Sequence, residues 1–206
     1  MRAWAAAALA LAAPAAAQEP EPLDGARLLR VGPGARHPLY DGFEQGCPAP
    51  SARCRSKAYL VEGDLVVADA PARGGFVEVR FTNGRGRTTQ GFLPEAALRP
   101  ATARSAGWVG RWRAAEREVA IGPAGGRLRV EGRATWGMLD PARVERGGVH
   151  TGGFSGAIGA AGTAALVADD ECRVRLRLLG PYLLASDNGR CGGFNVTFTG
   201  VYRRKG

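Results

Sequence analysis

The chain has 206 residues, and its 28 Lys and Arg residues against 19 Asp and Glu residues give a formal charge of +9. Hydrophobic residues make up 45% and charged residues 23% of the chain, which excludes a protein that is disordered throughout. Glycine is abundant, with 31 residues, but it shows no collagen-like period.

The first seventeen residues have the pattern of a secretory leader. Arg2 precedes an apolar run over residues 3–13, and three alanines at 15–17 precede Gln18. This pattern predicts a signal peptide over residues 1–17 that is cleaved on export. A membrane anchor is the alternative, but Pro14 interrupts a run that is already too short to span a bilayer. We therefore expect a bacterial protein that is periplasmic or secreted.

Four cysteines fall into two local pairs, Cys47 with Cys54 and Cys172 with Cys191. An exported chain meets an oxidising compartment, so this arrangement predicts two structural disulfides with local connectivity. A zinc site is the alternative, but neither pair has the usual spacing of two to four intervening residues. We expect no metal and no cofactor.

The remaining chain divides near residues 100–107, where Arg99-Pro100 leads into a run of small residues. We expect one module over residues 23–100 and a second over residues 107–206. Residues 18–102 hold 11 basic and 10 acidic residues, whereas residues 103–206 hold 16 basic and 9 acidic residues. The basic character therefore belongs to the second module, with a net charge of +7.

Apolar and polar residues alternate with a period of two in both modules. The clearest examples are residues 76–81, 127–130 and 173–178, and Asn83-Gly84 is a strong hairpin signal. A last strand is expected over residues 195–202. No helical period is sustained, so the fold class predicted is all-β: two small antiparallel β-barrel modules, with no helix beyond a turn or two.

Residues 57–98 resemble a bacterial SH3-like domain. The resemblance rests on three segments: residues 58–66 with Gly63-Asp64, residues 75–79, and residues 89–94, in which Phe92 stands where Trp is usual. It implies a small β-barrel whose ligands are peptides or cell-wall fragments. The aromatic residues that would line a binding groove are Tyr40, Tyr59, Phe76 and Phe92. The alternative is a barrel that serves only as a spacer, with these aromatics in its core.

The second module is similar to calycin-type barrels, which include the lipocalins. It begins with Trp108-Val109-Gly110-Arg111-Trp112 and ends with Tyr202-Arg203-Arg204. The resemblance implies that Trp112 packs under Arg204 and closes one end of a barrel, by a cation–π contact. The tail over residues 187–202 also resembles small bacterial periplasmic proteins, some of them labelled as lysozyme-inhibitor-like.

No catalytic constellation stands out. His37 and His150 lack companions at metal-ligand spacing, Ser155 does not lie in a nucleophile-elbow pattern, and the cysteines are expected to be oxidised. A pair of carboxylates for glycoside hydrolysis is left open. We expect a protein that is not an enzyme.

Arginines recur at every second position on two expected strands of the second module: Arg127, Arg129, Arg133, Arg173, Arg175 and Arg177. If these strands are close, six guanidinium groups share one face that can bind carboxylates or phosphates. The alternative is a solvated face in a chain whose basic residues are nearly all arginine. The compartment argues against nucleic acid, but it allows peripheral contact with anionic lipid.

These features favour a non-catalytic envelope binding or scaffolding protein that contacts a cell-wall fragment, a peptide or an envelope protein. The alternative is a periplasmic inhibitor of a cell-wall hydrolase. The charge of the second module disfavours it, because basic lysozymes would be repelled.

Overall fold

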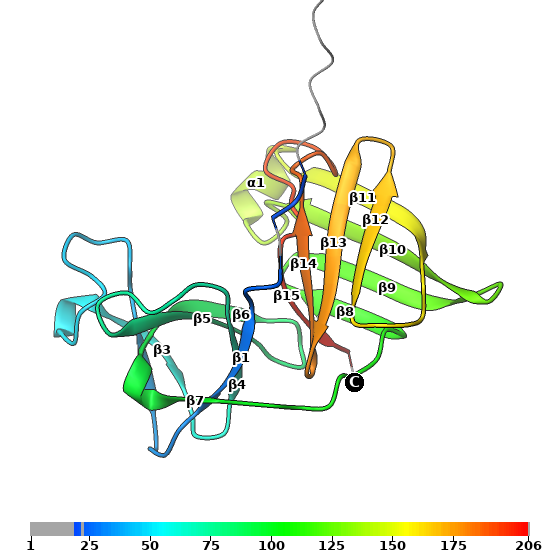
Figure 1. The fold of residues 1–206 in the computed structure, drawn as a ribbon. Coiled ribbons are helices and arrows are strands. Elements are labelled where there is room, and N and C mark those ends of the chain that lie inside the picture. Colours follow the sequence, from blue (N-terminus) through cyan, green and yellow to red (C-terminus); the bar gives the residue numbers. More distant parts are fainter. Residues whose placement is uncertain (1–18, 22, 206) are drawn as a thin grey trace, which may run out of the picture.

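A computed structural model describes residues 19–21 and 23–205, so the leader expected over residues 1–17 lies outside the described residues. The chain forms two antiparallel sheets, one from strands within residues 27–100 and one from strands within residues 110–204 (Figure 1). The all-β prediction is therefore confirmed.

The first sheet has seven strands in the order β3-β2-β6-β5-β4-β1-β7. Short 3₁₀ helices over Ala52–Cys54 and Glu95–Ala97 precede β3 and β7. The alternation in β5 has the predicted effect, because Val77 and Val79 are 2% and 1% exposed in the core of this sheet. The strands are β1 (Arg27–Val31), β2 (His37–Tyr40), β3 (Arg55–Leu60), β4 (Leu65–Ala68), β5 (Phe76–Thr82), β6 (Thr88–Pro94) and β7 (Leu98–Pro100).

The second sheet has eight strands in the order β11-β10-β9-β8-β15-β14-β13-β12 and is nearly closed into a barrel (Figure 1). Its edge strands β11 and β12 meet without a ladder, where the backbone N–H of Ser155 donates to the Asp169 carboxylate at 2.6 Å. The strands are β8 (Gly110–Ala114), β9 (Arg117–Ala124), β10 (Arg127–Trp136), β11 (His150–Ile158), β12 (Ala164–Asp169), β13 (Cys172–Leu179), β14 (Tyr182–Asp187) and β15 (Gly200–Arg204). The helix α1 (Pro141–Glu145) lies between β10 and β11.

The last strand begins later than predicted, at Gly200 and not at residue 195. The Asp187 carboxylate accepts hydrogen bonds from the backbone N–H groups of Phe198 and Thr199 and from the Thr197 hydroxyl. Because the Asp187 side chain already accepts from these backbone N–H groups, they are satisfied without pairing to a neighbouring strand. Phe198 is nevertheless fully buried in the barrel core.

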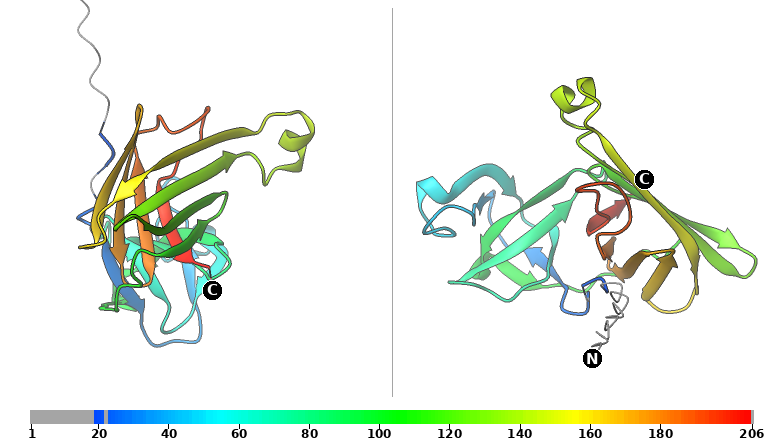
Figure 2. Two further views of the ribbon diagram at one scale, coloured as in Figure 1. Left: turned by 90° about the vertical axis from the view of Figure 1, so that its right-hand side faces the viewer. Right: turned by 90° about the horizontal axis from the view of Figure 1, so that it is seen from above.

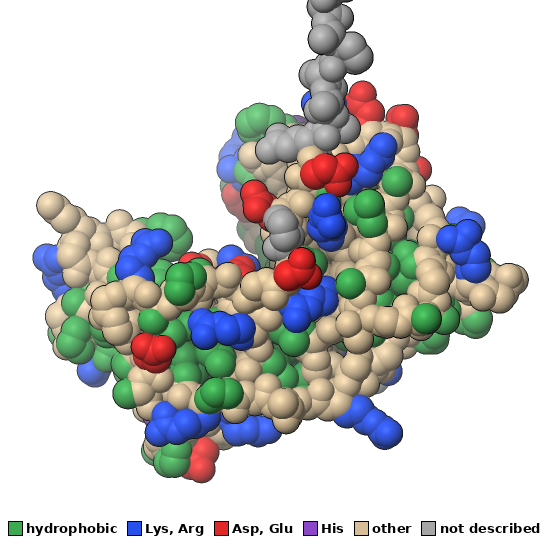
Figure 3. Space-filling model, in the orientation of Figure 1, with side chains coloured by type: hydrophobic (Ala, Val, Ile, Leu, Met, Phe, Trp, Pro, Cys, Tyr) green, Lys and Arg blue, Asp and Glu red, His purple; other side chains and the backbone are tan. Residues whose placement is uncertain are grey.

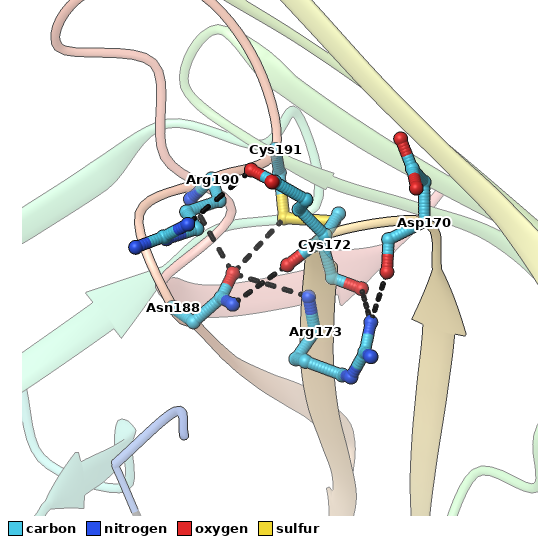
Figure 4. Close-up of polar contacts among 7 residues, drawn as sticks. Asp170, Cys172, Arg173, Asn188, Arg190 and Cys191 are labelled. Atoms are coloured by element: carbon cyan, nitrogen blue, oxygen red, sulfur yellow. Dashed lines mark hydrogen bonds and ion pairs between the residues drawn. A yellow bond between two sulfur atoms is a disulfide. The ribbon is translucent and has the colours of Figure 1, made fainter. Parts of the chain in front are cut away.

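Both predicted disulfides are present, Cys47–Cys54 and Cys172–Cys191. The second joins the start of β13 to the loop after β14, beside the side chain of Asn188 (Figure 4). The Asn188 amide oxygen accepts from the backbone N–H groups of Arg173 at 3.1 Å and Arg190 at 3.3 Å. The disulfide and Asn188 together fix this end of the β13–β14 hairpin.

The two sheets pack against each other through one shared apolar cluster. Buried residues of this cluster come from the first sheet and from the outer face of β14 and β15: Ala26, Leu28, Val67, Tyr182, Leu184 and Val201. The Tyr182 hydroxyl donates to the Leu65 carbonyl, and the Thr82 hydroxyl donates to the Val201 carbonyl at 2.6 Å. Burial raises the pKa of Tyr182 to about 12, so its hydroxyl keeps its proton.

Within residues 19–21 and 23–205, no helix has the length and apolar character needed to cross a membrane.

Candidate functional site: an arginine-lined groove where the two sheets meet

The turn between β5 and β6 forms one wall of the groove described below. The Asn83 side-chain oxygen accepts from the backbone N–H groups of Arg85 and Arg87, both at 3.0 Å, which shapes the turn and exposes Arg85. Gly86 has a φ of +78° and lies against the Cβ atom of Arg113, where a side chain would clash. Its carbonyl accepts from the N–H of Ala115 at 2.6 Å, so the turn is joined to the second sheet.

Three adjacent strands of the second sheet present a row of charged side chains. Arg113 on β8 and Arg133 on β10 are both register partners of Glu118 on β9. Glu118 binds Arg113 at 2.8 Å and Arg111 at 2.7 Å. Partial burial opposes its ionisation, but hydrogen bonds and charge from the two arginines outweigh burial and hold the pKa of Glu118 below its usual range.

The hairpin between β8 and β9 supplies the next two groups, Glu116 and Arg117. The Glu116 carboxylate accepts from the backbone N–H groups of Met138 at 2.5 Å and Leu139 at 3.2 Å, so it is engaged in holding the segment after β10. Arg117 begins β9 and carries its charge at the end of the barrel, beside Tyr202, whose pKa burial raises.

These elements enclose an open groove of about 540 Å³ at the junction of the two sheets. Both glutamates that line the groove already have partners. The charged residues that line it are four arginines and two glutamates: Arg85, Arg113, Arg117, Arg133, Glu116 and Glu118. Among the described residues, the side chains of Arg85, Arg117 and Arg133 make neither a hydrogen bond nor an ion pair. The groove therefore has an excess of positive charge, and arginine binds carboxylate and phosphate oxygens in pairs.

The arginines of β13 are occupied, contrary to the prediction of an open anion-binding face. Arg175 donates to the Pro20 carbonyl at 3.1 Å and lies 3.5 Å from the Glu19 carboxylate. Arg177 donates to the carbonyls of Leu23, Asp24 and Ala26 at 2.5, 3.3 and 3.0 Å. In Figure 1 this N-terminal segment runs up beside β13 and β14. Both side chains hold the segment and are not free for a ligand.

Arg173 is also engaged locally, because its guanidinium donates to the carbonyls of Asp170 and Cys172 at the turn before β13 (Figure 4). The six arginines do not share one face, since β10 and β13 are not neighbours in the sheet. On β10, Arg129 is paired with Glu131 at 2.7 Å, and Arg127 is exposed at the far end of the strand from Arg133. On the face shown in Figure 3, basic side chains are scattered and form no stripe.

Three of the four aromatics predicted for an SH3-like groove, Tyr40, Phe76 and Phe92, lie in one cluster, and Tyr59 is not part of it. Tyr40 and Phe76 are each 7% exposed and pack edge to face at 5.3 Å against the Cys47–Cys54 bridge. Tyr59 is 45% exposed beneath the guanidinium of Arg36. Phe92 lines a small hollow of about 240 Å³ together with Tyr40 and with Phe43, which no sequence pattern marks.

Trp112 and Arg204 have the geometry that the calycin resemblance implies. The guanidinium carbon of Arg204 lies 4.9 Å from the centre of the fully buried Trp112 ring. Arg204 also donates to the carbonyls of Ala106 and Gly107. The barrel interior is filled by large side chains with no exposed surface, among them Trp112, Phe198 and Tyr202.

Sequence reasoning missed Arg85, Arg113 and Arg117 as site residues. The turn signal at Asn83-Gly84 does predict an exposed Arg85, but only the packing of this turn on the second sheet brings it to the groove. No alternation pattern marks Arg117, which is the first residue of its strand and is partly exposed.

In the part of the chain that the structure describes, no group of three His, Cys, Asp or Glu side chains is arranged to hold a metal ion. Comparisons with protein-family models, with curated proteins and with solved structures find no match to this chain.

Proposed function

We propose that this chain is an exported bacterial envelope protein that binds an anionic envelope component and catalyses no reaction. The observation that carries the proposal is the junction groove, where Arg85 of the β5–β6 turn lies with Arg117 and Arg133 of the second sheet, and none of the three forms an ion pair among the described residues. The two disulfides support an oxidising compartment.

The groove fits binding better than the β13 arginines do, because three of its four guanidinium groups, those of Arg85, Arg117 and Arg133, have no protein partner to displace among the described residues. Its volume of about 540 Å³ lies within the range of small-molecule sites. Carboxylates of cell-wall peptides and phosphates of lipid headgroups are anions of the bacterial envelope that match this chemistry. Inhibition of a basic hydrolase is disfavoured, since the groove adds positive charge to an already basic half of the chain.

The test is cosedimentation of the purified protein with bacterial sacculi and with vesicles containing phosphatidylglycerol, at low and moderate salt. The variant Arg85→Gln/Arg117→Gln/Arg133→Gln should lose at least tenfold in affinity for whichever target the wild-type protein binds. The matched control is Arg55→Gln/Arg104→Gln/Arg127→Gln, which removes three exposed arginines outside the groove. Equal losses in both triple variants would show that only net charge matters, and the groove would be rejected as the site.

A further inference from the structure

The segment of residues 137–149 forms a lobe that projects from the barrel at the end of β10 and β11, as both views of Figure 2 show. We call it the α1 lobe. Its fold is well fixed: the Asp140 side chain caps α1 by accepting from the N–H of Ala142 at 3.0 Å, and it pairs with Arg143 at 3.3 Å. The Gly148 N–H donates to the Arg143 carbonyl at 2.8 Å. The projection is thus an ordered part of the structure.

Large apolar side chains are exposed on the α1 lobe. Leu139 is 74% exposed, Met138 50% and Val144 45%, within seven consecutive residues. Scattered exposed apolar residues need no explanation, but a concentration on a projecting segment indicates a contact surface. At the base of the lobe Arg143 lies 4.0 Å from the ring centre of Trp136, so this end of β10 is stabilised from the lobe side.

The α1 lobe is directly joined to the arginine groove. Glu116, which lines the groove, holds the backbone N–H groups of Met138 and Leu139. Thr135, the residue before Trp136, lines the groove as well. The exposed apolar tip and the unpaired guanidinium groups of Arg117 and Arg133 therefore belong to one continuous region.

We propose that this region docks on an anionic lipid bilayer, with Arg85, Arg117 and Arg133 contacting headgroup phosphates and Met138, Leu139 and Val144 entering the interface. This inference rests on the proposed function and assigns it one partner. A bilayer surface presents phosphates directly above an apolar layer, which matches a cationic groove beside an apolar tip. The net charge of +8 over residues 18–206 adds long-range attraction to such a surface. The acids of the lobe oppose it weakly, because Asp140 is paired with Arg143 and exposed Glu145 is followed by Arg146.

Trp136 provides a local reporter for the test. Of the three tryptophans in residues 18–206, Trp108 and Trp112 are 5% and 0% exposed, whereas Trp136 is partly exposed at the base of the lobe. Vesicles of phosphatidylglycerol carrying brominated acyl chains should quench Trp136 fluorescence, and neutral phosphatidylcholine vesicles should not. The variant Trp136→Phe should remove the quenchable signal and so assign it.

The variant Met138→Ser/Leu139→Ser should bind phosphatidylglycerol vesicles at least tenfold more weakly than the wild-type protein. Its matched control is Val109→Ser/Leu166→Ser, which alters two residues that are 50% and 46% exposed outside the lobe and should bind normally. If the lobe variant binds vesicles as well as the wild type and Trp136 is not quenched, membrane docking is wrong while groove binding stands. If the wild-type protein binds sacculi but not vesicles, membrane docking is likewise wrong and groove binding stands. Failure to bind sacculi and vesicles would reject both proposals.

Discussion

At the scale of the residue, Glu118 sets how much positive charge the groove keeps. Its single negative charge is shared between Arg111 and Arg113, and the neighbouring Arg133 has no ion pair among the described residues. The lowered pKa of Glu118 means that the folded state favours its charged form more than the unfolded state does. The associated stability is therefore present above the unfolded pKa and is lost as the pH falls through the folded pKa.

We predict that Glu118→Gln lowers the free energy of unfolding by up to about 1 kcal/mol at pH 7, the range for partly exposed ion pairs. The difference from the wild type should shrink below about pH 4, where the wild-type carboxyl group gains a proton. Urea unfolding at pH 7 and pH 3 measures this difference in the free energy of unfolding. The control is Glu145→Gln, at an exposed residue that has no ion pair among the described residues. A difference that grows on acidification would contradict this account.

Residue chemistry alone does not distinguish the arginines of the groove from those of β13. Arg133 and Arg177 lie on strands with the same period of two, and both were expected to face outward. The sequence predicts that direction from alternation, but it does not show what later covers a face. Residues 19–21 and 23–26 cover Arg175 and Arg177, whereas no side chain in the described part of the chain pairs with Arg133.

At the scale of the element, β13 acts as a clamp for the N-terminal segment. Arg175 and Arg177 together bind four backbone carbonyls between Pro20 and Ala26. Hydrogen bonds from a charged donor are stronger than neutral ones. The segment leads directly into β1, so the clamp also fixes where the first sheet begins.

Arg175→Gln/Arg177→Gln should release residues 19–26 while the barrel stays folded. Hydrogen exchange followed by mass spectrometry should show faster exchange in this segment, and the overall stability should fall by about 1–3 kcal/mol. The control Arg127→Gln/Arg129→Gln, on β10, should leave exchange in the segment unchanged. Unaltered protection in the clamp variant would mean that other contacts hold the segment.

Elements with regular alternation were predictable and those governed by side-chain capping were not. The strands around residues 76–81 and 173–178 and both disulfides agree with the sequence analysis. The early start expected for β15 was wrong, because the Asp187 carboxylate binds backbone groups that a strand would have used. The α1 lobe likewise depends on side chains that bind backbone N–H groups: Glu116, which is distant in sequence, binds Met138, and Asp140, within the lobe, binds Ala142. No periodic pattern marks these contacts in the sequence.

At the scale of the whole molecule, the shared apolar cluster makes the two sheets one structure. The outer faces of β14 and β15 are covered by Leu28 and Val67 of the first sheet, and Tyr182 and Thr82 add hydrogen bonds across the boundary. The groove exists only because this packing places the β5–β6 turn against β8. Sequence reasoning predicted two segments but not their contact, since no local pattern encodes it.

Leu184→Ala should destabilise both sheets together by about 2–5 kcal/mol, because it leaves a cavity in the shared cluster. Tryptophan fluorescence reports on the second sheet alone, since all three tryptophans of residues 18–206 belong to it, whereas far-ultraviolet circular dichroism reports on both. The two signals should give one coincident transition in wild type and variant. Separate transitions would show that the sheets unfold independently.

The central claim is that the junction groove is where this protein binds its anionic partner. Hydrogen exchange of the wild-type protein with and without phosphatidylglycerol vesicles, and with and without soluble cell-wall fragments, tests it most directly. We predict slower exchange on binding in residues 83–87, 115–118 and 133–139, with little change in β13. Protection confined to β13 or to the hollow around Phe92, with none at the groove, would contradict it.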